Sequence, residues 1–347
     1  MDAPQDFRAL PDLAVRTVGG SVVWANDESF GERHNLLLPG PPRFDAGQFG
    51  HRGKVYDGWE TRRRRDAGHD AAIIRLGLPG IVRGLVIDTA WFKGNAPAEA
   101  SVEAACVTGY PSAAELTAAY PSAEQLAGAV AWTTLVPRTA IKPDSQNVFG
   151  VDSPYRWTHL RLSIYPDGGV ARLRAHGEVV ADPWLLDVGG ADLAALEHGG
   201  RVTACSDMFY GSAANLISPG LATVMSEGWE TTRRRGDGND WVTLALAAPG
   251  IPRLAELDTT CFLHNAPGWA SLRGQVAGTG GSAGEADWCP LLGRTRLQPD
   301  TRHRFLIEDA PAVGQVRLDI YPDGGMARLR LLGTPTAAGR RAAGLRW

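Results

Sequence analysis

A run of arginines beside a tryptophan and a glutamate is the most unusual chemical feature of the sequence, in Gly58-Trp59-Glu60-Thr61-Arg62-Arg63-Arg64-Arg65. Guanidinium groups bind carboxylates and other planar anions in a bidentate manner, so this block predicts an anion-binding site. In an extended conformation, Glu60, Arg62 and Arg64 would face one way and their neighbours the other. A solvated basic loop, or an Arg–Glu pair that braces the fold, would leave the same pattern, and these interpretations stay open.

A histidine next to an aspartate follows in Gly68-His69-Asp70, and a later block reads Gly238-Asn239-Asp240. The His–Asp pair has the residue types of an acid–base unit or of metal ligands. Asp70 also suits the cap of a turn. The later block has asparagine instead of histidine, and the eight histidines show no HxH or HExxH spacing. The sequence therefore assigns no metal ligands and no cofactor, and it leaves open whether a metal assists.

A third block places polar residues directly after the apolar strand Leu85-Val86-Ile87, in Asp88-Thr89-Ala90-Trp91-Phe92-Lys93-Gly94-Asn95-Ala96-Pro97. Polar groups at the end of a buried strand are costly unless they are paired or functional. The part shared with a later block, Asp258-Thr259…Phe262…Asn265-Ala266-Pro267, is open to a structural interpretation as turn chemistry. Lys93 has no counterpart there, because Leu263 and His264 stand in place of Lys93 and Gly94.

These blocks occur twice in the same order. The arginine block returns 170 residues later as Glu227-Gly228-Trp229-Glu230-Thr231-Thr232-Arg233-Arg234-Arg235, and the third block returns at the same shift. Ile164-Tyr165-Pro166-Asp167-Gly168-Gly169 returns as Ile320-Tyr321-Pro322-Asp323-Gly324-Gly325, and Arg138-Thr139 returns as Arg294-Thr295. The chain is therefore a tandem duplication of one domain, with a period too long for a solenoid.

The elements that hold the blocks follow a period of two. In His159-Leu160-Arg161-Leu162-Ser163-Ile164 the apolar residues fall on one face, and Gln315-Val316-Arg317-Leu318-Asp319-Ile320 repeats the alternation. Tyr-Pro-Asp-Gly-Gly then supplies turn chemistry, so each copy is expected to end in a hairpin. Short strands between Gly and Pro signals predict an all-β sandwich in each copy.

The expected boundaries follow from composition. The first domain covers residues 13–180, a linker covers 181–200 with a short helix near Leu193–Glu197, and the second domain covers 201–334. The Ala-rich stretch Ser112–Val130, which is shorter and Gly-rich in the second copy, is the best helix candidate. The Ala-, Gly- and Arg-rich residues 335–347 are expected to form a loose tail.

Composition excludes several classes of protein. The chain has 347 residues, 44% of them hydrophobic and 21% charged, as in a globular protein of two domains. A net charge of −3 disfavours nucleic-acid and membrane partners. Four cysteines without CxxC spacing predict reduced thiols. With no signal peptide or long apolar run, the protein is expected to be cytoplasmic.

In combination and order, the blocks resemble those of the allantoicase family, from about Leu13 to Gly333. That resemblance implies two tandem jelly-roll domains of the galactose-binding-like type. It also implies allantoate as substrate, hydrolysed to ureidoglycolate and urea in purine breakdown, and a homo-oligomer. The sequence departs from the family at Ala71, where a tryptophan is common, and at Leu263-His264, so the two copies are not equivalent.

The resemblance suggests roles for the blocks. Arg63 and Arg64 are expected to clamp the substrate carboxylate. Glu60, beside the arginines, is expected to have a depressed pKa and to act as a base or an orienting anion. His69 or Lys93 is the expected proton donor. The candidate catalytic residues are thus Glu60, His69 and Lys93, and the candidate substrate-binding residues are Trp59, Arg63, Arg64, Asp88, Asn95, Glu230, Arg233, Arg234, Asp258, His264 and Asn265.

Three rival interpretations remain at this stage. Jelly rolls often bind sugars or other small ligands without chemistry, and the duplication would then give bivalency. A related ureido or amidine hydrolase would act on a different substrate. Nucleic-acid binding through the arginines is disfavoured by the net charge and the dispersed aromatic residues.

Overall fold

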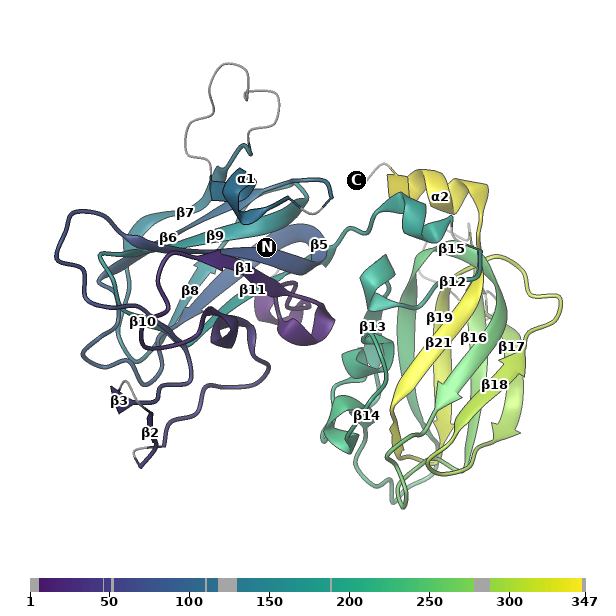
Figure 1. The fold of residues 1–347 in the computed structure, drawn as a ribbon. Helices are drawn as coiled ribbons and strands as arrows, with labels where there is room; N and C mark the ends of the chain where they lie inside the picture. The colour runs from purple at the N-terminus through teal and green to yellow at the C-terminus, as the bar shows by residue number, and fades with distance from the viewer. Residues whose placement is uncertain are drawn as a thin grey trace. The chain divides into compact units, whose positions relative to one another are not determined.

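The computed structural model describes residues 6–45, 47–50, 53–109, 111–117, 130–187, 189–277 and 288–344. The chain divides into two units, Met1–Val179 and Val180–Trp347, and each contains one copy of the repeated blocks. Figure 1 shows that both units consist mainly of strands. We call the two copies repeat 1 and repeat 2.

A single long strand organises repeat 1. The first part of β5 (Asp70–Asp88) pairs with β1 and β9, and its second part pairs with β8 and β11, all antiparallel. The main sheet has the order β1-β5-β9-β6-β7. The elements of repeat 1 are β1 (Ser21–Ala25), β2 (Phe49–Gly50), β3 (Gly53–Lys54), β4 (Trp59–Glu60), β5, β6 (Glu99–Ala105), α1 (Ala113–Thr117), β7 (Thr133–Ala140), β8 (Gln146–Gly150), β9 (Trp157–Tyr165), β10 (Gly169–Val170) and β11 (Arg172–Val179), with 3-10 turns at Phe7–Ala9, Arg16–Val18 and Arg33–Leu37.

Repeat 2 has the same organisation around β15 (Asp240–Asp258), which pairs with β13 and β19 and then with β18 and β21. The all-β prediction of two duplicated jelly-roll sandwiches is therefore confirmed. The other elements are β12 (Ala191–Asp192), β13 (Arg201–Cys205), β14 (Trp229–Glu230), β16 (Trp269–Val276), β17 (Trp288–Arg296), β18 (Arg302–Leu306), β19 (Val313–Tyr321), β20 (Gly325–Met326), β21 (Arg328–Pro335) and α2 (Ala337–Gly344), with 3-10 turns at Pro183–Leu186, Leu196–His198, Ala213–Ile217 and Met225–Glu227.

The expected hairpin at Tyr-Pro-Asp-Gly-Gly is wrong. β9 pairs with residues 70–75 and with Gly80 of β5, whereas β11 pairs with residues 80–88 of the same strand. The described strands β9 and β11 do not pair with each other. The register of β5 shifts between Arg75 and Gly80, and that of β15 shifts between Ala245 and Gly250. Gly and Pro at these shifts allow the strand to bend. The turn therefore connects β9, which pairs mainly with the first part of β5, to β11, which pairs with the second part. The turn itself lies beside the arginine block, where Asp167 accepts the Arg64 amide.

Two composition-based boundaries also differ from the structure. Residues 181–200, expected to be a linker, belong to unit 2, where β12 pairs with β21 and Leu193 is fully buried. The predicted loose tail is wrong, because α2 forms there and contacts β15. The N-terminal end of the helix is held by Thr336, which accepts a hydrogen bond from the Gly339 amide and donates one from its own amide to the Pro249 carbonyl of β15. The helix expected in Ser112–Val130 is present at Ala113–Thr117, and residues 118–129 lie outside the described part of the chain.

The repeated blocks build the core next to the arginine segment. Trp59 and Trp229 are fully buried, as are Phe92 and Phe262 of the third block. The second glycine of the turn is needed for this packing. A Cβ at Gly169 would lie 2.1 Å from the Phe92 ring, and a Cβ at Gly325 would lie 2.0 Å from the Phe262 ring.

A buried histidine makes repeat 1 sensitive to acid. His159 on β9 is 2% exposed, and burial, with Arg75 nearby, lowers its pKa from 6.5 to about 4. The unfolded chain therefore binds this proton first, and stability is lost as pH falls from about 6.5 through about 4, by about 3 kcal/mol. Repeat 2 has Gln315 at the equivalent place opposite Ala245, as His159 stands opposite Arg75.

We therefore expect His159→Gln to remove most of this acid loss, as measured by the urea midpoint of unfolding near pH 7 and near pH 4.5. His34→Gln, at a half-buried histidine of the same repeat, should keep the wild-type pH dependence. An equal acid loss in the wild type and His159→Gln would show that other groups cause it.

Candidate active site

The arginine segment of repeat 1 is anchored at both ends by carboxylates from other parts of the chain. The Arg62 amide donates to Asp27 Oδ1 at 3.0 Å, and the Arg64 amide donates to Asp167 Oδ2 at 2.8 Å. The buried Trp59 ring donates from Nε1 to the Asp27 carbonyl at 2.8 Å. Only Trp59 and Glu60 are in a strand, so the alternating faces expected for the whole block do not form.

Arg64 is a structural arginine. Its Nη1 lies 2.5 Å from Oδ1 of Asp70, which is 1% exposed, and Asn26 donates to the same oxygen at 2.8 Å. Its Nη2 also lies 3.1 Å from the exposed Asp66. The ion pair with Asp70 neutralises much of the Arg64 charge, so this side chain is a weaker carboxylate ligand than the sequence suggested.

The neighbouring arginines are available to a ligand. Arg63 and Arg65 are exposed, and neither contacts a partner among the described residues. Arg62 is 76% exposed and lies 3.2 Å from Asp27. An open depression of about 320 Å³ is lined by Asn26, Asp27, Arg62, Arg63, Arg64, Arg65, Asp66 and Asp70.

Glu60 does not pair with any of these arginines. Its Oε1 accepts a hydrogen bond from Asn95 Nδ2 at 2.6 Å, which brings the first and third blocks together. Burial raises the pKa of Glu60 above its usual 4.5, and the Asn95 hydrogen bond offsets only part of that effect. The expectation of a depressed pKa is therefore wrong, because the arginines beside Glu60 in sequence point to Asp27 and Asp70 instead.

The backbone carbonyl of His69 contacts Arg64, which lines the depression. Its carbonyl accepts a hydrogen bond from Arg64 Nη1 at 3.3 Å, and its ring centroid lies 4.8 Å from that of Tyr165. Desolvation lowers the pKa of His69, and the positive charges of Arg64 and Arg161 lower it further. The ring is thus predominantly neutral near pH 7, as a base requires.

The repeated Arg-Thr pair has a structural explanation. Arg138 lies over the Tyr165 ring at 4.2 Å, and Arg294 lies over the Tyr321 ring at the same distance. Each tyrosine hydroxyl is also hydrogen-bonded to a serine, Ser101 in repeat 1 and Ser271 in repeat 2. This arrangement fixes the end of β9 and of β19 where the turn begins.

Four other candidates lie outside the depression or have a structural role. Lys93 is 72% exposed, its Nζ lies 3.7 Å from Asp144 Oδ2, and it does not line the depression. Asp88 is buried and caps the following turn by accepting the Ala90 amide at 2.8 Å, as Asp258 accepts the Thr260 amide. His264 is exposed on the equivalent loop of repeat 2.

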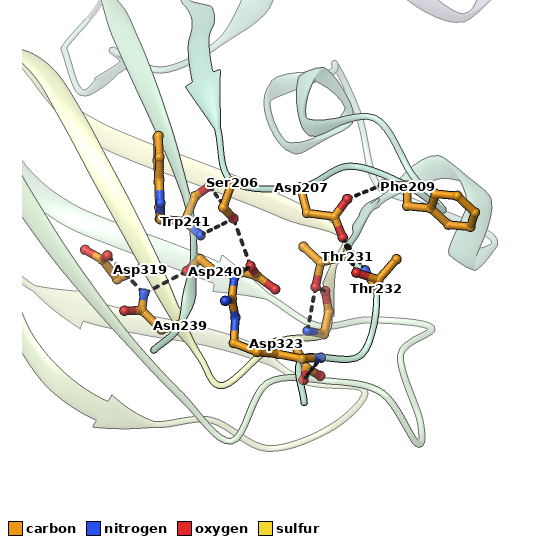
Figure 2. A network of polar contacts seen from close by, with 12 residues as sticks. Ser206, Asp207, Phe209, Thr231, Thr232, Asn239, Asp240, Trp241, Asp319 and Asp323 are labelled. Atoms are coloured by element: carbon orange, nitrogen blue, oxygen red, sulfur yellow. Dashed lines mark hydrogen bonds and ion pairs between the residues drawn. The ribbon is translucent and has the colours of Figure 1, made fainter. Parts of the chain in front are cut away.

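Repeat 2 repeats the anchors, as Figure 2 shows. Asp207 accepts the Thr232 amide, as Figure 2 shows. Asp323 accepts the Arg234 amide at 2.7 Å. Arg234 is ion-paired with the buried Asp240. Asn265 donates to Glu230 Oε1 at 2.5 Å.

Sequence reasoning missed the anchoring residues Asn26, Asp27 and Asp167. A signal for two of them was present, because Asp27 and Asp207 both follow the first strand of their repeat, and Asp167 and Asp323 recur in the turn. Their role could not be deduced, since each binds a segment remote in sequence.

Neither a metal cluster nor a membrane span is found in the part of the chain that the structure describes. No three His, Cys, Asp or Glu side chains there are grouped so that they could hold a metal ion. No described helix has the length and apolar character needed to cross a bilayer.

The fold and the site define a duplicated β-sandwich protein with an arginine-lined depression in repeat 1. Residues 11–180 and 191–336 match the family model of the allantoicase repeat. The chain is 53% identical to a probable allantoicase of Nocardia farcinica, covering 95% of this chain and 96% of that protein. It is 50% identical to one of Streptomyces coelicolor, covering 96% and 88%. The crystal structure of allantoicase from Saccharomyces cerevisiae aligns with a TM-score of 0.74 at 32% identity, over 94% of this chain and 93% of that one. The chain belongs to the allantoicase family.

Proposed function

We propose that this chain hydrolyses allantoate to ureidoglycolate and urea. Family membership across both repeats supports this activity. The observation that carries the proposal is the depression in repeat 1, where Arg63 and Arg65 are exposed and have no partner among the described residues. The homo-oligomer and the cytoplasmic location expected from the sequence stay predictions.

The substrate carboxylate binds to Arg63 and Arg65. Allantoate carries one carboxylate and two ureido groups on a single carbon, and unpaired guanidinium groups suit the carboxylate. Because Arg64 is held by Asp70, it sets the position of its neighbours rather than binding the anion itself. The hydrogen-bonding groups of Asn95 and Glu60 suit a ureido group.

The directions of two pKa shifts support an assignment of the proton transfers. Burial raises the pKa of Glu60 and desolvation lowers that of His69, so Glu60 is the acid and His69 the base. Glu60 Oε1 is occupied by Asn95, which leaves Oε2 to carry the proton. These roles reverse those that the sequence suggested.

The reaction balances with these two groups. One C–N bond breaks, the leaving urea nitrogen takes a proton from Glu60, and the lone pair of the other ureido nitrogen forms a C=N bond. His69 removes a proton from water as its oxygen attacks that carbon. The nitrogen of the C=N bond keeps its own hydrogen and regains its lone pair as the C–O bond forms, which completes ureidoglycolate. The proton that His69 has gained replaces the one that Glu60 has lost, so allantoate plus water yields ureidoglycolate plus urea.

A product assay tests the function. With purified protein and allantoate, we expect urea and ureidoglycolate in equal amounts, with and without a chelator. Ammonia in place of urea would indicate a deiminating hydrolase. No product from folded protein would favour a non-catalytic ligand-binding role.

A further inference from the structure

Repeat 2 keeps the framework that presents arginines in repeat 1. The backbone amides of Thr232 and Arg234 are held by Asp207 and Asp323, as those of Arg62 and Arg64 are held in repeat 1. Figure 2 shows these two anchors, and Ser206 hydrogen-bonded to Asp240. Ser206 thus takes the place of Asn26, which binds Asp70.

The residue between the two anchors is again an exposed arginine. Arg233 and Arg235 are exposed and contact no partner within the described residues, whereas Arg234 is ion-paired with Asp240. The Nε of Arg234 is buried without a hydrogen-bond partner, as is that of Arg64. The polar pair beside the segment is also kept, as Glu230 and Asn265.

The base of the proposed reaction is not kept. Asn239 replaces His69, and its Nδ2 donates to Asp319 at 3.1 Å and to the Asp240 carbonyl at 2.9 Å. A carboxamide held in this way cannot take a proton from water. Repeat 2 therefore keeps the two exposed arginines and has no counterpart of the His69 imidazole.

We propose that repeat 2 is a second binding site for small ureido carboxylates, which it holds without hydrolysing them. Arg233 and Arg235 bind the carboxylate, and Glu230 with Asn265 binds the ureido group. This inference rests on the proposed function of repeat 1. Each chain would thus bind two molecules of the same class and turn over only one.

Binding stoichiometry tests the proposal. The probe is N-carbamoylglycine, which carries one carboxylate and one ureido group and has no second ureido group to lose. Titration calorimetry should give two molecules bound per wild-type chain. Arg63→Ala/Arg65→Ala should bind one, with urea release from allantoate reduced by about 100-fold or more. Adding Arg233→Ala/Arg235→Ala should abolish the remaining binding.

Two controls keep the outcomes separate. Arg302→Ala removes an exposed arginine of unit 2 without a partner among the described residues, and it should keep both molecules bound. Circular dichroism should show that each variant is folded. Loss of all binding in Arg63→Ala/Arg65→Ala, or urea release still near half the wild-type rate, would overturn the proposal. Wild-type chain that releases no urea would refute the proposed function instead, whatever the stoichiometry.

Discussion

Glu60→Gln should lower kcat for allantoate by about 100- to 10,000-fold and change KM little. Glutamine keeps the shape and the hydrogen bond with Asn95 but cannot donate a proton to the leaving nitrogen. The wild-type rate should fall as pH rises through the pKa of Glu60, which burial places above 4.5, because the protonated form is the acid. Initial rates of urea release across a pH series measure both effects.

A matched variant separates this role from a general effect of charge. Glu32→Gln neutralises an exposed glutamate of repeat 1 that has no side-chain partner among the described residues, and its rates should equal the wild type. If Glu60→Gln keeps the wild-type rate and pH profile, Glu60 is not the acid.

Asp70→Ala should destabilise the chain by about 3 kcal/mol, because it leaves Arg64 without its buried partner. The same change removes an acceptor of Asn26. For a unit of this size, the loss corresponds to a fall in Tm of roughly 6–12 °C in the transition of repeat 1. Activity should fall as well, since the segment that presents Arg63 would lose one of its supports.

Asp66→Ala removes the other carboxylate that contacts Arg64. That carboxylate is 76% exposed, so its loss should cost less than about 0.5 kcal/mol. Calorimetric scans of both variants compare a buried and an exposed partner of the same arginine. Equal losses of stability in the two variants would mean that the burial of Asp70 does not determine its contribution to the free energy of unfolding.

The duplication and the strand pattern could be predicted because they are local properties of the sequence. Alternating residues such as Leu160, Leu162 and Ile164 are all buried on β9, as their period of two requires. The pairing of β11 with β5 could not be predicted, because the turn chemistry at Pro166 fits a hairpin equally well. Only the length and bend of β5 decide between the two pairings.

The site was predicted only in part, because the sequence shows the residue types and does not show their tertiary partners. Residue types drew attention to the arginine block, to His69 and to Glu60. Which arginine is free and which is paired depends on Asp27, Asp70 and Asp167, whose positions are set by tertiary structure. The pKa of Glu60 likewise follows burial rather than its neighbours in sequence.

The two-sided anchoring of the arginine segment has a consequence for how this protein can change. In repeat 1 the backbone is held at residues 62 and 64, and in repeat 2 at residues 232 and 234. The side chain between them, Arg63 or Arg233, is exposed and contacts no partner among the described residues. A new side chain at that position alters what the surface recognises and leaves folding untouched. Because the chain holds two copies, a substitution at this position in one repeat can change its ligand while the other repeat keeps its own.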